Sequence, residues 1–493
     1  MLKMVDGTGI IGVDMVCPLG GAVSPPQPPN FDKVEMEGVG SLTLPNSLKA
    51  PLERLELTGN SVQGENPAPD NPQEIKSCGR KSKNIFNKNA VKQGYEFGAM
   101  LSDAETVKQG WFVSDFMPVK ATTYQISGKK TGAGCKLYSK DKVFVKNIQA
   151  PFGGIKIEEG IAYFRINGEI KDLDNIQVEE GTVATDYEPY SDTCLLDVKV
   201  TGKNLFNAEK AKDANNWTSS AILPSYKEFS IYVGKGNSVN ISYLENLETG
   251  LGFYANIARS KNDYTMYWLY LSDSEINITK NKNFIAMNDY IVLRVDAGSV
   301  PKFFEYIKTL QIEIGSKQTP YEPYTEQTLT LTSDRPITKW DKLVEQDGEY
   351  GWLYKHRIVN DLSALVKDSE PIYGKDGEKY FSVSLQGALL NYDYNKIYSV
   401  AGMCPKDSKM HYVPKPMKQS VIIYVSDTDT IMTAKEHMHY KVIYETTESQ
   451  FVPLSEPEQT QLRNLHSYNG TTHITVDSGE VPCGIKLTYR KEK

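Results

Sequence analysis

Cysteine and histidine are both scarce in this sequence, whose 493 residues include six of each. The cysteines stand far apart without any Cys-x-x-Cys pair, so neither a zinc ribbon nor a thioredoxin-like motif can be built from them. The closest histidines, His437 and His439, flank Met438, which is no zinc ligand, and we interpret them as exposed strand residues. We therefore expect no metal site, no cofactor, and six small buried thiols in a chain that folds in a reducing compartment.

Long hydrophobic runs are also missing. The best apolar run, residues 421–425, has the length of a buried strand and falls far short of the roughly 18 residues of a membrane span. Near the N-terminus, the apolar residues 9–13 end at Asp14, too early for the apolar region of a signal peptide. The sequence thus predicts a soluble chain that is made in the cytoplasm without a signal peptide and does not insert into membranes.

Excess positive charge and catalytic motifs are lacking as well. Lys and Arg number 55 against 62 Asp and Glu, and the net charge of -7 makes nucleic acid a poor partner. A G-x-G-x-x-G pattern occurs at residues 7–12, but the proline and glycines that follow leave little room for the helix of a nucleotide site. Glu179 and Glu180 are adjacent, so on a strand they point to opposite faces and cannot form a glycosidase pair. We expect no catalytic residues and no enzymatic activity.

Tyrosine and short alternating apolar segments are abundant. The chain has 30 Tyr beside 16 Phe and 5 Trp, and Tyr is favoured in strands. From Leu52 onwards, short apolar alternations are broken by Gly, Asn, Asp and Pro, which is typical of β-sandwiches and barrels. Asn167 and Gly168 suit the turn of a β-hairpin. The proline-rich residues 18–30 are expected to run extended, as a tether or docking arm.

An internal duplication is the most informative feature. The motif Lys-Asn-Ile-Phe-Asn at residues 83–87 recurs as Lys-Asn-Leu-Phe-Asn at residues 203–207, an offset of 120. Residues 176–190, which end in Tyr-Glu-Pro-Tyr, recur at residues 310–324 with 8 of 15 positions identical and an offset of 134. The second copy is therefore 14 residues longer between these anchors. We predict one β-sandwich that is used twice, with the extra residues in loops.

These features predict a mainly β chain with tandem jelly-roll-like β-sandwich modules and a small α+β C-terminal module. A capping box from Ser455 to Glu458, with Pro457 in the first turn, predicts one short helix over residues 459–466. The expected domains are an N-terminal attachment segment with a Pro-rich linker (1–50), a first β-sandwich module (51–190), its duplicate (191–324) and a β-rich C-terminal module with one short helix (325–493).

Several segments resemble tail proteins of phages and prophages of Gram-positive bacteria. Residues 55–63, continuing through the proline-rich residues 67–72 to Cys78 and Gly79, resemble a segment common in those proteins. In them it precedes a Lys-Asn-Leu-Phe-Asn β domain that closes on Ile-Gln-Leu-Glu-Glu-Gly and Tyr-Glu-Pro-Tyr, a pattern that both copies here approximate. Residues 440–477 also resemble the terminal modules of such proteins.

The resemblance implies a fibre, baseplate or receptor-binding protein of the virion tail, with modules related to carbohydrate-binding domains and a homotrimeric assembly. The expected function is host adhesion through bacterial cell-wall polysaccharide, with other tail or baseplate proteins as partners. Two alternatives stay open: a purely architectural baseplate or tail component that contacts no host glycan, and a glycan-degrading tail enzyme.

The candidate carbohydrate-binding residues lie on one predicted strand, residues 264–271. Alternation places Tyr264, Trp268 and Tyr270 on one face and the leucines on the other. If the leucine face meets the core, an aromatic row is exposed and can stack on sugar rings. The alternative is a strand that is buried on both faces.

Overall fold

The computed structural model is mainly β, as the sequence predicts. Its described residues contain three short α-helices, α1 (Ala208–Lys212), α3 (Ile431–Glu436) and α4 (Glu456–Asn464), and their other regular elements are strands and 3-10 helices. The structure describes residues 5–6, 9–10, 30–64, 71–98, 102–129, 134–148, 153–182, 184–220, 224–242, 254–258, 266–270, 281–296, 310–366, 371–391, 393–400, 411 and 413–493.

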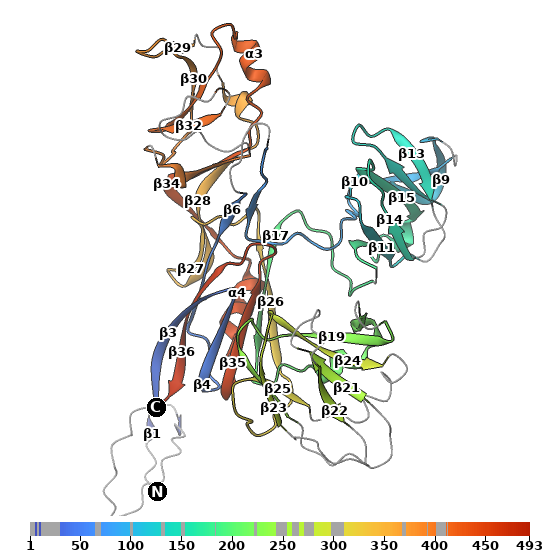
Figure 1. Ribbon diagram of the computed structural model, residues 1–493, viewed down its shortest axis with the longest axis vertical. Coiled ribbons are helices and arrows are strands. Elements are labelled where there is room, and N and C mark those ends of the chain that lie inside the picture. The colour runs from blue at the N-terminus through green and yellow to red at the C-terminus, as the bar shows by residue number, and fades with distance from the viewer. Residues whose placement is uncertain are drawn as a thin grey trace, which may run out of the picture.

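An eleven-stranded antiparallel sheet forms the centre of the molecule (Figure 1). The chain leaves this sheet and returns to it several times, so its strands come from widely separated stretches of sequence. In spatial order they are β26 (Glu326–Ser333), β17 (Cys194–Thr201), β35 (Gly470–Asp477), β4 (Ser41–Ser47), β36 (Gly484–Glu492), β5 (Arg54–Thr58), β27 (Lys342–Gln346), β28 (Glu349–Val359), β34 (Val442–Pro453) and β31 (Ile397–Ser399), with β3 (Phe31–Val39) paired to β36.

The sequence predicts four consecutive domains. The central sheet differs from this expectation, because it combines strands from several of them. Strands β3 and β4 belong to the expected attachment segment, yet they pair with β36 and β35 near the C-terminus. The reason is physical: alternation of apolar residues marks a strand, but it does not specify a partner that lies hundreds of residues away in the chain. Two small hairpins complete this part of the fold, β1 (Val5–Asp6) with β2 (Gly9–Ile10) and β6 (Ser61–Gln63) with β7 (Ile75–Ser77).

The central core consists mainly of aliphatic side chains, and the largest of its buried aromatic residues is Trp352. This residue is 2% exposed, and its indole N–H donates to the Thr332 carbonyl at 2.8 Å, so the buried donor is satisfied. Helix α4 contributes Leu462 to the same core. The predicted capping box is present at its start, where the Ser455 backbone N–H donates to Glu458 Oε2 at 3.0 Å.

Three modules are inserted into the central sheet, and at the base of each the two connecting segments are joined by backbone pairing (Figure 1). The first lies between Arg80 and Leu195, which exchange two backbone hydrogen bonds of 2.9 Å. The second lies between β17 and β26, which pair along their whole length. The third lies between β28 and β34, which pair as far as Val359 and Val442. Each insertion is therefore a loop that backbone pairing closes at its base.

The first and second modules share one strand order. In the first, a sheet ordered β13-β12-β15-β9-β8 with β10 on β15 packs against β14-β11-β16; in the second, β22-β21-β24-β19-β18 packs against β23-β20-β25. The bounds are β8 (Val91–Phe97), β9 (Glu105–Ser114), β10 (Met117–Pro118), β11 (Thr123–Ser127), β12 (Cys135–Tyr138), β13 (Phe144–Ile148), β14 (Gly153–Lys156), β15 (Tyr163–Glu169), η1 (Ile170–Asp172), β16 (Gln177–Glu180), η2 (Ala214–Asn216), β18 (Thr218–Ser219), β19 (Tyr226–Tyr232), β20 (Ser238–Ser242), β21 (Tyr254–Ala258), β22 (Met266–Tyr270), β23 (Asn281–Ile285), β24 (Tyr290–Asp296) and β25 (Gln311–Ile314).

The third module is a four-stranded sheet with helix α3. Its elements are η3 (Leu362–Leu365), β29 (Ile372–Tyr373), β30 (Lys379–Ser384), η4 (Tyr394–Lys396), β32 (Pro414–Met417) and β33 (Ser420–Tyr424), in the sheet order β29-β30-β33-β32. His437 caps the C-terminal end of α3, and the exposed His439 lies 3.0 Å from Asp361. The expectation of strand histidines is therefore wrong, because the Thr430 capping box starts a helix just before them.

The hairpin predicted at Asn167 and Gly168 is also wrong. Both residues lie inside the continuous strand β15, where Asn167 pairs with Val113 and Gly168 with Phe112. A Cβ atom on Gly168 would lie 3.0 Å from the Phe112 ring. The glycine therefore permits close approach of a neighbouring aromatic ring within the sheet.

Hydrogen bonds from one asparagine close each duplicated module. Asn84 donates from Nδ2 to the Ile176 carbonyl at 2.9 Å, and its Oδ1 accepts from the N–H groups of Phe86 and Val178 at 2.9 and 3.0 Å. Asn204 repeats this pattern with Leu310, Phe206 and Ile312 at 3.0 to 3.2 Å. We call this arrangement the asparagine staple, because it joins the opening segment of a module to its last strand.

A second repeated set of bonds fixes the chain after that last strand. Thr185 donates its backbone N–H to Glu179 Oε1 at 2.7 Å, and its hydroxyl donates to Oε2 at 2.6 Å. Thr319 makes the same two bonds to Glu313 at 2.9 and 2.6 Å. The two motifs that recur in the sequence thus contain the polar side chains whose hydrogen bonds close each module.

Replacing Asn84 with Ala is expected to open the first module locally. The substitution leaves two backbone N–H groups and one carbonyl without their partner, which costs roughly 2–4 kcal/mol of unfolding free energy. Hydrogen exchange measured by mass spectrometry will show faster exchange in peptides covering residues 84–86 and 176–178. Asn89→Ala, at an exposed position in the same segment, serves as the control. Unchanged protection in the Asn84 variant would contradict the staple.

Candidate functional site

The aromatic row proposed from the sequence lies mostly outside the described residues. Tyr264 falls outside them, and Trp268 and Tyr270 belong to β22, whose side chains are not described. Among the described strands, β22 pairs only with β21, at one edge of the second module's larger sheet. The proposed carbohydrate contact of these residues therefore stays a prediction.

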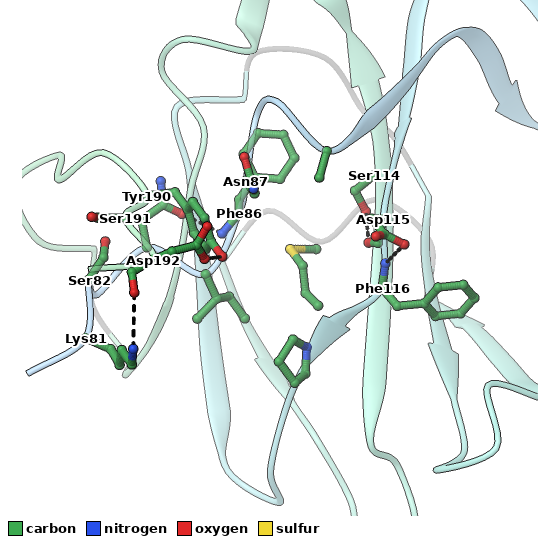
Figure 2. Close-up of a pocket in the computed structure, with 15 residues that line it drawn as sticks. Lys81, Ser82, Phe86, Asn87, Ser114, Asp115, Phe116, Tyr190, Ser191 and Asp192 are labelled. Atoms are coloured by element: carbon green, nitrogen blue, oxygen red, sulfur yellow. Dashed lines mark hydrogen bonds between the residues drawn. The ribbon is translucent and has the colours of Figure 1, made fainter. Parts of the chain in front are cut away.

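A cavity of about 330 Å³ lies in the first module, where three chain segments meet. These are the opening segment, the turn between β9 and β10, and the closing residues after the Tyr-Glu-Pro-Tyr motif. Figure 2 shows side chains from all three segments around one space. The lining residues are Lys81, Ser82, Asn84, Ile85, Phe86, Asn87, Ala90, Ser114, Asp115, Phe116, Met117, Pro118, Tyr190, Ser191 and Asp192.

One wall of the cavity is polar and comes from the closing segment. The Tyr190 hydroxyl donates to Asp192 Oδ1, and this bond together with burial raises the pKa of Tyr190 to about 12. Lys81 Nζ donates to the Asp192 carbonyl at 3.3 Å. The phenol is thus a neutral donor at physiological pH, and the Asp192 carboxylate remains an acceptor at the rim.

The opposite wall is the turn from Ser114 to Phe116 (Figure 2). Ser114 Oγ accepts from the Ile166 N–H at 2.9 Å and donates to the Asp115 carbonyl at 2.9 Å. Asp115 Oδ1 accepts from the Phe116 N–H at 2.7 Å. These bonds hold the backbone of the turn and keep the exposed Asp115 carboxylate at the rim of the cavity.

Apolar side chains form the rest of the lining. Phe86 is 1% exposed and Met117 is 4% exposed. The Phe116 ring points away from this space (Figure 2) and packs at 4.8 Å against Tyr138, with the Arg165 guanidinium 4.8 Å from its centre. The cavity therefore combines an apolar floor with hydrogen-bonding groups at its rim, which suits a small amphipathic ligand.

A larger hollow of about 790 Å³ lies on the third module. It follows the outer face of β30 and β33, where hydroxyl and amide groups alternate with apolar side chains. The lining residues are Ile372, Tyr380, Ser382, Ser384, Ala388, Leu389, Leu390, Asn391, Met417, Lys418, Gln419, Ser420, Ile422 and Thr447.

The thiols and metal-ligating groups of the described part show no site for redox or metal chemistry. Four cysteines are described, and each is free and buried, as expected; Cys17 and Cys404 lie outside the described residues. Burial raises the pKa of the Cys135 thiol to about 12, so this thiol stays protonated. Within the described residues, His, Cys, Asp and Glu form no group of three that could hold a metal ion.

Comparisons with known proteins add little. The chain matches no protein-family model and no curated protein. Among solved structures, arabinofuranosyltransferase AftD from Mycobacteria has a TM-score of 0.12 at 10% identity, covering 93% of this chain and 36% of that chain. Infectious bursal disease virus Gt strain has a TM-score of 0.09 at 7% identity, covering 96% and 85%. Scores this low show no shared fold and carry no argument. None of the helices in the described part is long and apolar enough to span a membrane.

The residues of the first-module cavity were not predicted as a site from the sequence. A signal was nevertheless present, since the duplicated motifs supply Asn84, Phe86, Asn87 and Tyr190 to the lining. The motifs mark where the chain begins and closes each module, so their neighbourhood is where the two segments must meet. The contribution of Asp115 could not be found this way, because it lies in the turn between β9 and β10, outside the duplicated motifs.

An unpaired lysine in the first module gives a pH-dependent prediction. Lys129 Nζ is buried without a hydrogen-bond partner among the described residues, and burial lowers the pKa of Lys129 to about 8. Because the folded pKa is below the unfolded value of 10.5, the stability cost is complete below pH 8 and decreases as the pH rises towards 10.5. Lys129→Met is therefore expected to stabilise the module at pH 7, and the gain should shrink between pH 8 and 10.5.

Hydrogen exchange of the first module, measured at several pH values and corrected for intrinsic rates, checks this prediction. Lys140→Met, at an exposed position of the same module, is the matched control and should change little. A gain for Lys129→Met that stays constant up to pH 10.5 would show that the ammonium is not the source of the cost.

Proposed function

We propose that this chain is a structural protein of a phage tail that attaches the particle to the bacterial surface by binding cell-wall polysaccharide. The observation that supports this role best is the arrangement of small β modules inserted in a central sheet. Such an arrangement presents several surfaces on one stable base, which favours weak binding to a repetitive polymer. The resemblance of its motifs to phage tail proteins supports the assignment of this chain to a phage tail.

The placement of the third module also agrees with an attachment role. Phe31 at the start of β3 pairs with Glu492 near the end of β36, so these two strands lie side by side. In Figure 1 the third module lies at the opposite end of the central sheet from these two strands. One end of the molecule is thus available for the tail, while the modules extend away from it.

Two other functions remain as alternatives. A purely architectural baseplate or tail component would use the same modules as protein contacts and would bind no host glycan. A glycan-degrading tail enzyme would need two carboxyl groups about 5–10 Å apart with a bound sugar between them. The module architecture is compatible with the first alternative, so a binding experiment has to separate it from adhesion.

The full-length protein is expected to co-sediment with host cell walls, and less so with walls stripped of polysaccharide. Trp268→Ala is expected to weaken this retention several-fold without unfolding the second module, because truncating an exposed stacking residue removes a contact at little cost in stability. Unfolding of the module would show that the strand is buried on both faces. No retention of the wild-type protein on walls would favour the architectural alternative.

The chain is also expected to self-associate as a homotrimer, because symmetry multiplies weak binding sites at no cost in sequence. Multi-angle light scattering should then give about three times the chain mass of 55.3 kDa at micromolar concentration. The measurement is repeated at tenfold dilution to detect dissociation. A mass that stays at one chain under both conditions would contradict the assembly.

A further inference from the structure

The two duplicated modules differ most clearly in the segment that follows the Lys-Asn-x-Phe-Asn motif. In the first module, only residues 88–90 separate Asn87 from β8. In the second, residues 208–217 separate Asn207 from β18 and fold as α1 and η2. Most of the additional length of the second copy at this point is thus used to build a small helical cap.

The cap ends in a tryptophan that fills the second module from inside. Trp217 is 3% exposed, and its indole N–H donates to the Ala211 carbonyl at 2.7 Å. Its ring lies 5.5 Å from that of Phe229, which in turn lies 6.1 Å from Phe206 of the motif. Aromatic side chains therefore occupy the space between the opening segment and strand β19.

The ring of Phe112 lies 5.7 Å from that of Phe86, as the ring of Phe229 lies near Phe206, but by strand register the position of Phe229 is taken by a small residue in the first module. Phe229 stands four positions before Val233, whose N–H bonds the Asp289 carbonyl where this strand leaves the sheet. The equivalent bond in the first module joins Val119 to Ala162. Counting back from Val119, and allowing for the one extra residue between the β9 and β10 pairings with β15, gives Ser114.

Ser114 and Ala90 both line the cavity of the first module. Because no helical cap follows Asn87, the first module has no counterpart of Trp217, and the space beside Ala90 and Ser114 is open. The rim of this space is polar. Asp115 and Asp192 each use one carboxylate oxygen in a described hydrogen bond, which leaves the other oxygen available.

We propose that this cavity binds one pyranose ring of a surface polysaccharide, an inference that rests on the function proposed above. A pyranose has apolar C–H faces that match Phe86 and Met117, and hydroxyl groups that can donate to Asp115 and Asp192. The volume of about 330 Å³ is at the lower end for small-ligand pockets, as a single-ring subsite requires.

The chemistry of the rim argues for a sugar that carries no negative charge. Two carboxylates repel an anionic ring, and the Lys81 ammonium is already engaged with the Asp192 carbonyl at 3.3 Å. A phenylalanine side chain of a partner protein would fit the floor but would supply no donors to the carboxylates. The ligand class is therefore a neutral or amino pyranoside.

The test uses the full-length protein and the methyl glycosides of glucose, galactose, rhamnose, N-acetylglucosamine and glucosamine as probes, with methyl glucuronoside as the anionic comparison. Saturation-transfer difference NMR reports binding. At least one of the five should give a signal in the wild-type protein that drops at least fivefold in Ala90→Trp, which imitates the aromatic filling of the second module. Asp115→Asn, which keeps the side-chain shape, should also weaken the signal.

Lys140→Trp and Asp141→Asn are the matched controls, because they introduce the same residues at exposed positions of the same module. Hydrogen exchange of the first module verifies that each variant is folded. The proposal is overturned if none of the five glycosides binds, if methyl glucuronoside binds best, or if the signal persists in both cavity variants. Cell-wall co-sedimentation of the same preparations then decides separately whether the adhesion function survives.

Discussion

The fold depends on one constraint: the two chain segments that connect each module to the central sheet must run side by side. A module whose ends lay far apart could not be inserted between neighbouring strands without opening the sheet. Arg80 and Leu195 meet this constraint by exchanging backbone hydrogen bonds of 2.9 Å. The Arg80 guanidinium reinforces the junction, with Nε 2.6 Å from Asp197 and Nη1 2.8 Å from Glu188. One side chain thus ties the last turn of the module to strand β17.

The asparagine staple extends the same constraint into the module itself. Strand pairing at the base brings the two connecting segments together, and Asn84 or Asn204 then attaches the opening segment to the last strand of the sandwich. Each polar atom of this side chain has a buried backbone partner, so a replacement leaves several groups unsatisfied at once. The recurrence of this asparagine in the sequence is therefore explained by closure of the module.

Local features of the sequence predicted local structure well. The β-strand patterns and the capping box of α4 each depend on residues within a few positions of one another. The duplication is visible because two short motifs recur in the sequence. Strand partners were not predictable, because pairing of β3 with β36 joins residues at opposite ends of the chain. Asn167 and Gly168 show the same limit, since pairing of their strand on both sides overrides the turn preference of the dipeptide. The cavity escaped prediction because it lies where three chain segments meet, and one of them is outside the duplicated motifs.

Differences between the two copies suggest how one module type can acquire different surfaces. The staple and the strand order are the same in both, while the segment after Asn87 or Asn207 changes from three residues to a helical cap. Variation confined to such a segment changes the contents of the cavity without disturbing the closure that holds the module together.

The small size of a single cavity limits the affinity that it can reach. A ring of about a dozen atoms that gains roughly 0.3 kcal/mol per atom binds with a Kd on the order of 1 mM. Attachment at such a site requires several modules or chains that engage one polymer simultaneously, so an adhesion role for this protein and its assembly into a multimer depend on each other.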